Sequence, residues 1–114
     1  MFGNFMNEAL NKGMRIIIQH YIKSYGEVTA LSIDDSTKEM KATLLLKGEL
    51  QTLDVRIIGY NFVRIDDKGY MTFLKLSTSR EWLNLVLQDH PPKELKERKV
   101  EIPPAAAIIL KFVF

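Results

Sequence analysis

The sequence predicts an α+β domain in which a long N-terminal helix packs across a curved antiparallel sheet of about five or six strands. Three observations carry this prediction. Apolar residues recur at helical spacing through the first 25 residues, alternate at strand spacing over the next fifty, and form a short helical stripe around Trp82. A second, short helix is therefore expected before the last strand.

Residues 2–25 form the predicted first helix because apolar side chains return every three or four positions. Gly26 follows the last of them, where a left-handed C-cap favours glycine, and Gly13 marks a possible bend. The apolar stripe consists of Phe2, Phe5, Met6, Ala9, Leu10, Met14, Ile17, Ile18, Tyr21, Ile22 and Tyr25. The opposite, polar face consists of Asn4, Asn7, Glu8, Asn11, Lys12, Arg15, Gln19 and Lys23.

Alternating apolar residues and turn-forming residues predict the strands that follow. Residues 34–38 and 66–69 have turn composition, and Gly59 is expected to mark a bulge or bend. Because the connections are short, neighbouring strands should be antiparallel. The predicted strands cover residues 27–33, 40–46, 53–57, 60–65, 70–76 and 100–102.

The last third of the chain predicts a helix, a charged loop and a strand. Thr78 and Glu81 have the spacing of a capping box, residues 79–89 carry an apolar stripe, and Trp82 is expected in the core. Residues 93–99 are charged and expected to be exposed. Residues 105–114 are rich in Ile, Val and Phe near their end, which favours a final strand.

Composition indicates one globular domain over residues 1–114. The chain is 46% hydrophobic and 26% charged, and it has no cysteine, which excludes a disulfide framework, a thiolate nucleophile and a cysteine-based metal site. The net charge of +2 is too small to indicate nucleic-acid binding. Residues 1–10 lack the pattern of a secretory signal, and no apolar run is long enough to span a bilayer. We therefore expect a soluble cytoplasmic protein.

The residues that bear chemistry do not form a recognisable catalytic or metal-binding pattern. His20 and His90 lack further candidate ligands nearby in the sequence. Asp34–Asp35 and Asp66–Asp67 fall in predicted turns, where aspartate serves local hydrogen bonding. No nucleophile elbow, phosphate-binding loop or dinucleotide motif occurs. We therefore expect no enzymatic activity, no metal and no cofactor.

The excess of large apolar residues on the first helix and the facing strands favours a binding domain for a lipid or another apolar molecule. Its ligand is expected between the helix and the sheet. The candidate ligand-binding residues are Phe5, Ile17, Tyr21, Leu44, Ile57 and Trp82.

Two alternatives remain open from the sequence. The apolar segment 105–114 is also typical of a protein-interaction module, with a homodimer formed through the C-terminal strand. The basic polar face of the first helix, with Lys12, Arg15 and Lys23, suits peripheral contact with an anionic membrane.

Three short motifs carry a resemblance: Tyr25–Thr29, Leu46–Glu49 and Ser79–Asn84. Together they resemble a family of small uncharacterised bacterial proteins, which implies a bacterial source but no particular activity. The predicted fold, a helix held against a curved sheet, is also similar to the half-modules of tubular lipid-binding proteins. That similarity implies an apolar ligand.

Overall fold

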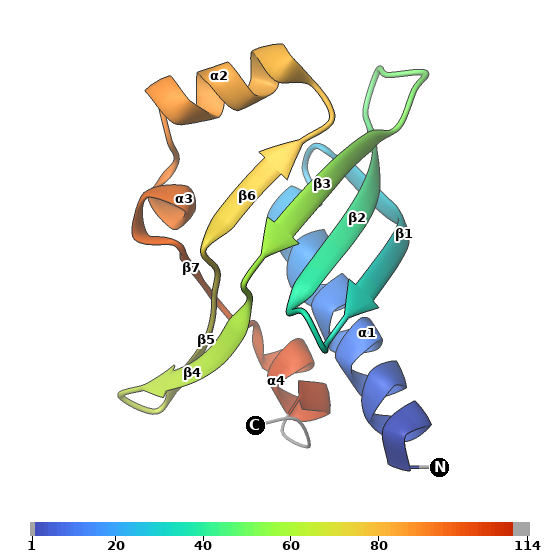
Figure 1. Cartoon of the computed structure of the whole chain (residues 1–114), viewed down its shortest axis with the longest axis vertical. Helices are drawn as coiled ribbons and strands as arrows, with labels where there is room; N and C mark the ends of the chain where they lie inside the picture. Colours follow the sequence, from blue (N-terminus) through green and yellow to red (C-terminus); the bar gives the residue numbers. More distant parts are fainter. Residues whose placement is uncertain (1, 111–114) are drawn as a thin grey trace.

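The computed structural model describes residues 2–110, with side chains from Asn7 onward, and has the predicted α+β composition. Its elements are arranged as Figure 1 shows. The helices are α1 (Phe2–Ile22), α2 (Glu81–Asp89), α3 (Lys93–Glu97) and α4 (Pro104–Leu110). The strands are β1 (Gly26–Asp34), β2 (Glu39–Leu46), β3 (Leu53–Ile58), β4 (Asn61–Ile65), β5 (Lys68–Thr72), β6 (Lys75–Thr78) and β7 (Lys99–Glu101).

The strands form two antiparallel sheets, and the prediction of a single sheet is wrong. The larger sheet has the order β1-β2-β3-β6, and the smaller one has the order β4-β5-β7. The division arises within one long hairpin, in which β3 pairs with β6 and β4 pairs with β5. Apolar alternation continues through both halves of this hairpin, so the sequence pattern predicts the strands but does not reveal the break.

The break lies at Gly59, where the hairpin bends as the sequence predicts. Gly59 has a φ of +72°, a left-handed conformation that glycine adopts without steric cost. The Lys38 carbonyl accepts hydrogen bonds from the amides of Gly59 and Tyr60 at 2.8 and 3.2 Å. On the other arm, the Leu74 amide donates to the Ile58 carbonyl at 2.9 Å. The bend is thus fastened to the turn between β1 and β2.

Tyr60 secures this bend from inside the core. Its side chain is buried, and its hydroxyl donates to Asp35 Oδ1 at 2.6 Å. Lys38 Nζ donates to the same oxygen at 2.8 Å and lies 5.6 Å from the centre of the Tyr60 ring. The hydrogen bonds from Lys38 and Tyr60 lower the pKa of Asp35, while burial and the Asp35 carboxylate raise the pKa of Tyr60.

α1 packs across one face of the larger sheet, as predicted (Figure 1). The helix ends at Ile22, so Gly26 lies in β1 and is not a left-handed cap. One core joins the helix to both sheets, because it includes Met40 from β2 and Met71 from β5. Its buried members are Leu10, Met14, Ile17, Met40, Ile57, Tyr60, Met71, Phe73, Ile102, Ala106 and Leu110.

The polar side of α1 binds the free edge of β1. Asn11, Arg15 and Gln19 lie four residues apart, so they follow one another along one side of the helix. Asn11 Nδ2 donates to the Leu31 carbonyl at 3.3 Å, and Arg15 Nη1 donates to the Val28 carbonyl at 3.4 Å. The Gln19 amide donates to the Gly26 carbonyl and accepts from the Val28 amide at 2.9 Å. These side chains occupy main-chain groups that would otherwise be open to another strand.

The C-terminal segment is helical where it is described, so the predicted strand over residues 105–110 is wrong. Pro104 begins α4, a position that proline favours because its missing N–H needs no partner there. Ala106 and Leu110, four residues apart, are fully buried. The contact of α4 with α1 stabilises the helix despite the β-branched residues near its end. Residues 111–114 of the predicted strand lie outside the described residues.

The helices around residue 90 also differ in detail from the prediction. α2 begins at Glu81, and Thr78 and Glu81 form no capping box, because the N-cap residue is Arg80 and its side chain makes no capping hydrogen bond. The charged segment 93–99 contains the short helix α3 and the first residue of the strand β7. Among the described helices, none is both long and apolar enough to cross a bilayer.

Gly13 generates the first testable prediction. A Cβ there would lie 2.5 Å from Leu110 Cγ, so the absence of a side chain at Gly13 lets Leu110 of α4 pack directly on α1. Overpacking costs roughly 1–3 kcal/mol, and the better helix propensity of alanine offsets only about 1 kcal/mol of that. We expect Gly13→Ala to lower the free energy of unfolding in urea. In a Leu110→Ala background the same change should be neutral or stabilising, and an equal loss in both backgrounds would contradict this contact.

Asp35 generates a prediction for acid stability. The pKa of Asp35 is lowered in the folded state. The stabilisation that its carboxylate contributes is therefore fully present above the unfolded pKa near 3.8, and it is lost as the pH falls through the folded pKa. Tyr60→Phe removes one of the two bonds responsible and should cost about 1 kcal/mol at neutral pH. Urea unfolding at pH 7 and pH 3 should show a smaller acid-induced loss for Tyr60→Phe than for the wild type. Equal losses would show that this hydrogen bond does not shift the Asp35 pKa.

Candidate functional site: a groove at the free edge of β6

The structure places some of the predicted ligand-binding residues together between α1 and the sheet. Ile17 and Ile57 are buried in the main core, with 1% and 5% of their surfaces exposed. Tyr21 packs against the same core, and its hydroxyl donates to the Glu101 carbonyl at 2.7 Å, which ties α1 to β7. Burial, above all, raises the pKa of this phenol. Met14 is fully buried beside them, so side chains fill this layer.

The other predicted residues lie apart from that group. Leu44 is buried in a smaller cluster with Val28 and Ala42. Trp82 is 59% exposed on α2, so its expected place in the core is wrong. α2 has no buried residue because the helix stands away from the main core. The side chain of Phe5 lies outside the described part of the chain. A lipid site between α1 and the sheet stays a prediction.

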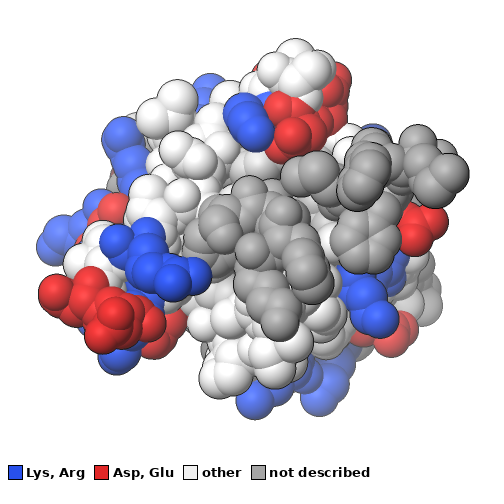
Figure 2. Space-filling model, turned by 90° about the horizontal axis from the view of Figure 1, so that it is seen from below, with Lys and Arg blue, Asp and Glu red and all other residues white. Residues whose placement is uncertain are grey.

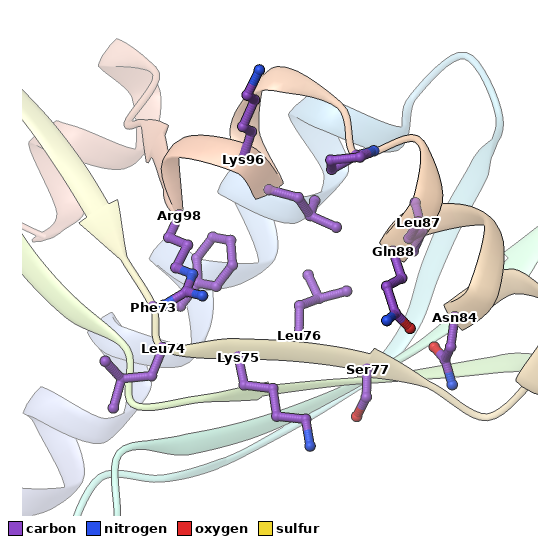
Figure 3. A pocket seen from close by; sticks show the side chains of 12 residues that line it. Phe73, Leu74, Lys75, Leu76, Ser77, Asn84, Leu87, Gln88, Lys96 and Arg98 are labelled. Atoms are coloured by element: carbon purple, nitrogen blue, oxygen red, sulfur yellow. The ribbon is translucent and has the colours of Figure 1, made fainter.

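A groove lies instead between β6, α2 and α3 (Figure 3). Its volume is about 560 Å³, within the range of small-ligand pockets, and it is open to solvent. The chain reaches it three times, as β6, as α2 and as the segment from Pro91 to Arg98. Its lining residues are Phe73, Leu74, Lys75, Leu76, Ser77, Asn84, Leu87, Gln88, Pro91, Leu95, Lys96 and Arg98.

The centre of the groove is apolar. Leu76 points into it from β6, whereas Lys75 and Ser77 point to the other side of the strand (Figure 3). Leu87 on α2 and Leu95 on α3 complete the apolar walls, and all three leucines are half-buried. The groove can therefore take up an apolar side chain with little rearrangement.

The outer edge of β6 provides hydrogen-bonding groups beside these leucines. In an antiparallel ladder, alternate residues direct both N–H and C=O to the same neighbour. The Ser79 amide donates to the β3 side, to the Asp54 carbonyl, whereas the main-chain groups of Thr78 bond to Asn84 on α2. Leu76 lies two residues before Thr78 in the same ladder, so it directs its main-chain groups to the same side as Thr78, away from β3 and toward the groove.

At Thr78, the main-chain groups of this edge are hydrogen-bonded to the Asn84 side chain. Its Oδ1 accepts from the Thr78 amide at 2.7 Å, and its Nδ2 donates to the Thr78 carbonyl at 3.0 Å. At the other end, the Phe73 amide donates to the Arg98 carbonyl at 3.1 Å. Between these two contacts, the N–H and C=O of Leu76 make no hydrogen bond within residues 2–110. Main-chain groups are strong hydrogen-bonding groups, so this pair is open to a partner or to water.

The charged residues of the groove lining are basic. They are Lys96 and Arg98, together with Lys75, which points to the other side of β6 (Figure 3), and no acidic side chain is in the lining. None of these three cations forms an ion pair with another described residue. By contrast, basic and acidic side chains are mixed over the described part of the face in Figure 2, where neither sign gathers into a patch.

The sequence contains little signal for this site. Leu95 is a single apolar residue within a charged segment, and that is the one clue that the segment packs on something. The α2 sequence has apolar residues on several sides, so periodicity does not separate Leu87, which lines the groove, from the exposed Leu85. The edge position of β6 depends on strand order, which no local pattern reveals.

Among residues 7–110, no three His, Asp or Glu side chains lie close enough together to hold a metal ion, and no charged side chain is buried. Comparison with protein-family models, with curated proteins and with solved structures gives no match. The resemblance to a bacterial family therefore stays a prediction, and the proposals below depend on geometry alone.

Asn84 provides a local test of this geometry. Asn84→Ala removes both hydrogen bonds to Thr78, which should cost about 1–2 kcal/mol of unfolding free energy. Hydrogen exchange should then accelerate most at the Thr78 amide, because it loses its acceptor. The exposed Gln88→Ala change on the same helix is the control. Unchanged exchange at Thr78 in Asn84→Ala would contradict the edge contact.

Proposed function

We propose that this chain is a non-enzymatic protein-interaction domain that holds an extended peptide segment of another protein in the groove between β6, α2 and α3. The proposal rests on the main-chain pair of Leu76, which by strand alternation faces the groove of about 560 Å³ and has no hydrogen bond among the described residues. A ligand that satisfies both groups must offer one acceptor and one donor at strand spacing. An extended peptide offers that pair at every second residue.

Binding proceeds by addition of a strand to the edge of β6. One ligand residue exchanges two hydrogen bonds with Leu76, and a side chain adjacent to it enters the apolar space between Leu87 and Leu95. Asn84 and the Arg98 carbonyl hold the neighbouring edge positions, so few main-chain bonds are available. Each such bond contributes only about 0.5–1.5 kcal/mol. The interaction therefore belongs to the transient class of peptide contacts.

Paired leucine variants of α2 test this proposal. Short random peptides displayed on phage are selected against the full chain, and the most enriched peptide is synthesised. Leu87→Glu places a carboxylate in the groove and should weaken binding of that peptide at least tenfold, about 1.4 kcal/mol. Leu85→Glu makes the same chemical change on the same helix, but at an exposed position outside the groove, and should leave affinity unchanged.

An NMR titration locates the peptide independently of the variants. The Leu76 amide should shift and become protected from hydrogen exchange on binding. The proposal is wrong if selection yields no binder, if both leucine variants affect binding equally, or if the shifts fall away from β6 and α2.

A further inference from the structure

Arg98 is held at the end of the groove nearest Phe73. It closes α3 in a left-handed conformation, with φ of +56°, and its amide donates to the Glu94 carbonyl. Its own carbonyl accepts from the Phe73 amide at 3.1 Å, which fastens this residue to the connection between β5 and β6. The side chain lies beside Phe73 in Figure 3. The main chain of Arg98 thus sets where its guanidinium group can reach.

The guanidinium group of Arg98 is exposed and makes no hydrogen bond or ion pair with another described residue. Of the other charged residues in the lining, Lys96 is basic, and Lys75 points to the other side of β6 (Figure 3). Glu94 and Glu97 of α3 lie outside the lining, so the charged groups that border the groove itself, Lys96 and Arg98, attract an acidic ligand. A guanidinium group matches a carboxylate in particular, because its planar donors bind both oxygens at once.

We propose that the peptide bound in this groove is acidic, with a carboxylate that pairs with Arg98 and an apolar residue that enters between Leu87 and Leu95. This inference rests on the proposed function and names its ligand class. Arg98 is fastened to Phe73, three residues before Leu76. The acidic residue therefore lies on the Arg98 side of the ligand residue that pairs with Leu76.

The test repeats the phage selection against the wild type, Arg98→Asn and Lys93→Asn. Asparagine tolerates the left-handed conformation required at residue 98, so this variant should fold. Lys93 lies on α3 outside the groove lining, so Lys93→Asn removes an equal charge from the same segment. Wild type and Lys93→Asn should both enrich Asp or Glu at one fixed spacing from an apolar residue. Arg98→Asn should lose that enrichment and keep the apolar residue.

Affinity measurements with the enriched peptide complete the test. Replacing its acidic residue by the corresponding amide should weaken binding to the wild type about tenfold, the effect of one charge-assisted hydrogen bond. The same replacement should have little effect on binding to Arg98→Asn, and binding to the wild type should weaken as salt rises.

The outcomes separate the two proposals. Two outcomes would make the acidic ligand class wrong while the peptide groove stands. In both, Leu87→Glu abolishes peptide binding; in the first the wild type selects no acidic residue, and in the second Arg98→Asn selects acidic residues as strongly as the wild type. If Leu87→Glu has no effect on any selected peptide, the groove itself is wrong.

Discussion

The bend of the long hairpin at Gly59 and Tyr60 is the constraint on which the rest of the fold depends. It divides one hairpin into two sheets, and the Lys38 carbonyl fastens it to the neighbouring turn. Because β4 and β5 turn away from the larger sheet at this point, β5 can pair with β7 and complete the smaller sheet. The buried Tyr60 ring fills the angle between the two sheets, and its hydroxyl reaches Asp35 at the surface. Without the bend, β6 would continue directly into β5 and the groove would have no closed end.

Local patterns in the sequence were sufficient to predict the long helix, most strands and the bend at Gly59. They were insufficient where long-range contacts decide the conformation. Ile108 and Ile109 favour a strand on propensity, yet the segment is helical because Leu110 fits against Gly13 of α1. The polar residues of α1 were correctly separated from the apolar ones. The sequence did not predict that three of these polar residues bind the edge of β1, because that edge lies outside the helix in the sequence. The three are Asn11, Arg15 and Gln19.

The candidate site could be predicted less well than the fold. Composition identified apolar residues in excess, but the same residue types make a core and a binding surface. Ile17 and Ile57 belong to the core, and Trp82 is exposed on a helix that has no buried residue. The groove depends on where α2 and α3 lie relative to β6, and on the orientation of one main-chain pair. Neither property has a local sequence signature.

The edge of β1 gives the larger sheet an inherent polarity. Its side-chain partners come from α1, which is also anchored in the core through Met14 and Ile17, so displacing them means displacing the helix. One edge of the larger sheet is therefore covered by side chains, and β6 is its other edge. If a strand joins the β6 edge as proposed, the larger sheet is monovalent: it accepts one strand in a one-to-one complex, because α1 covers the opposite edge.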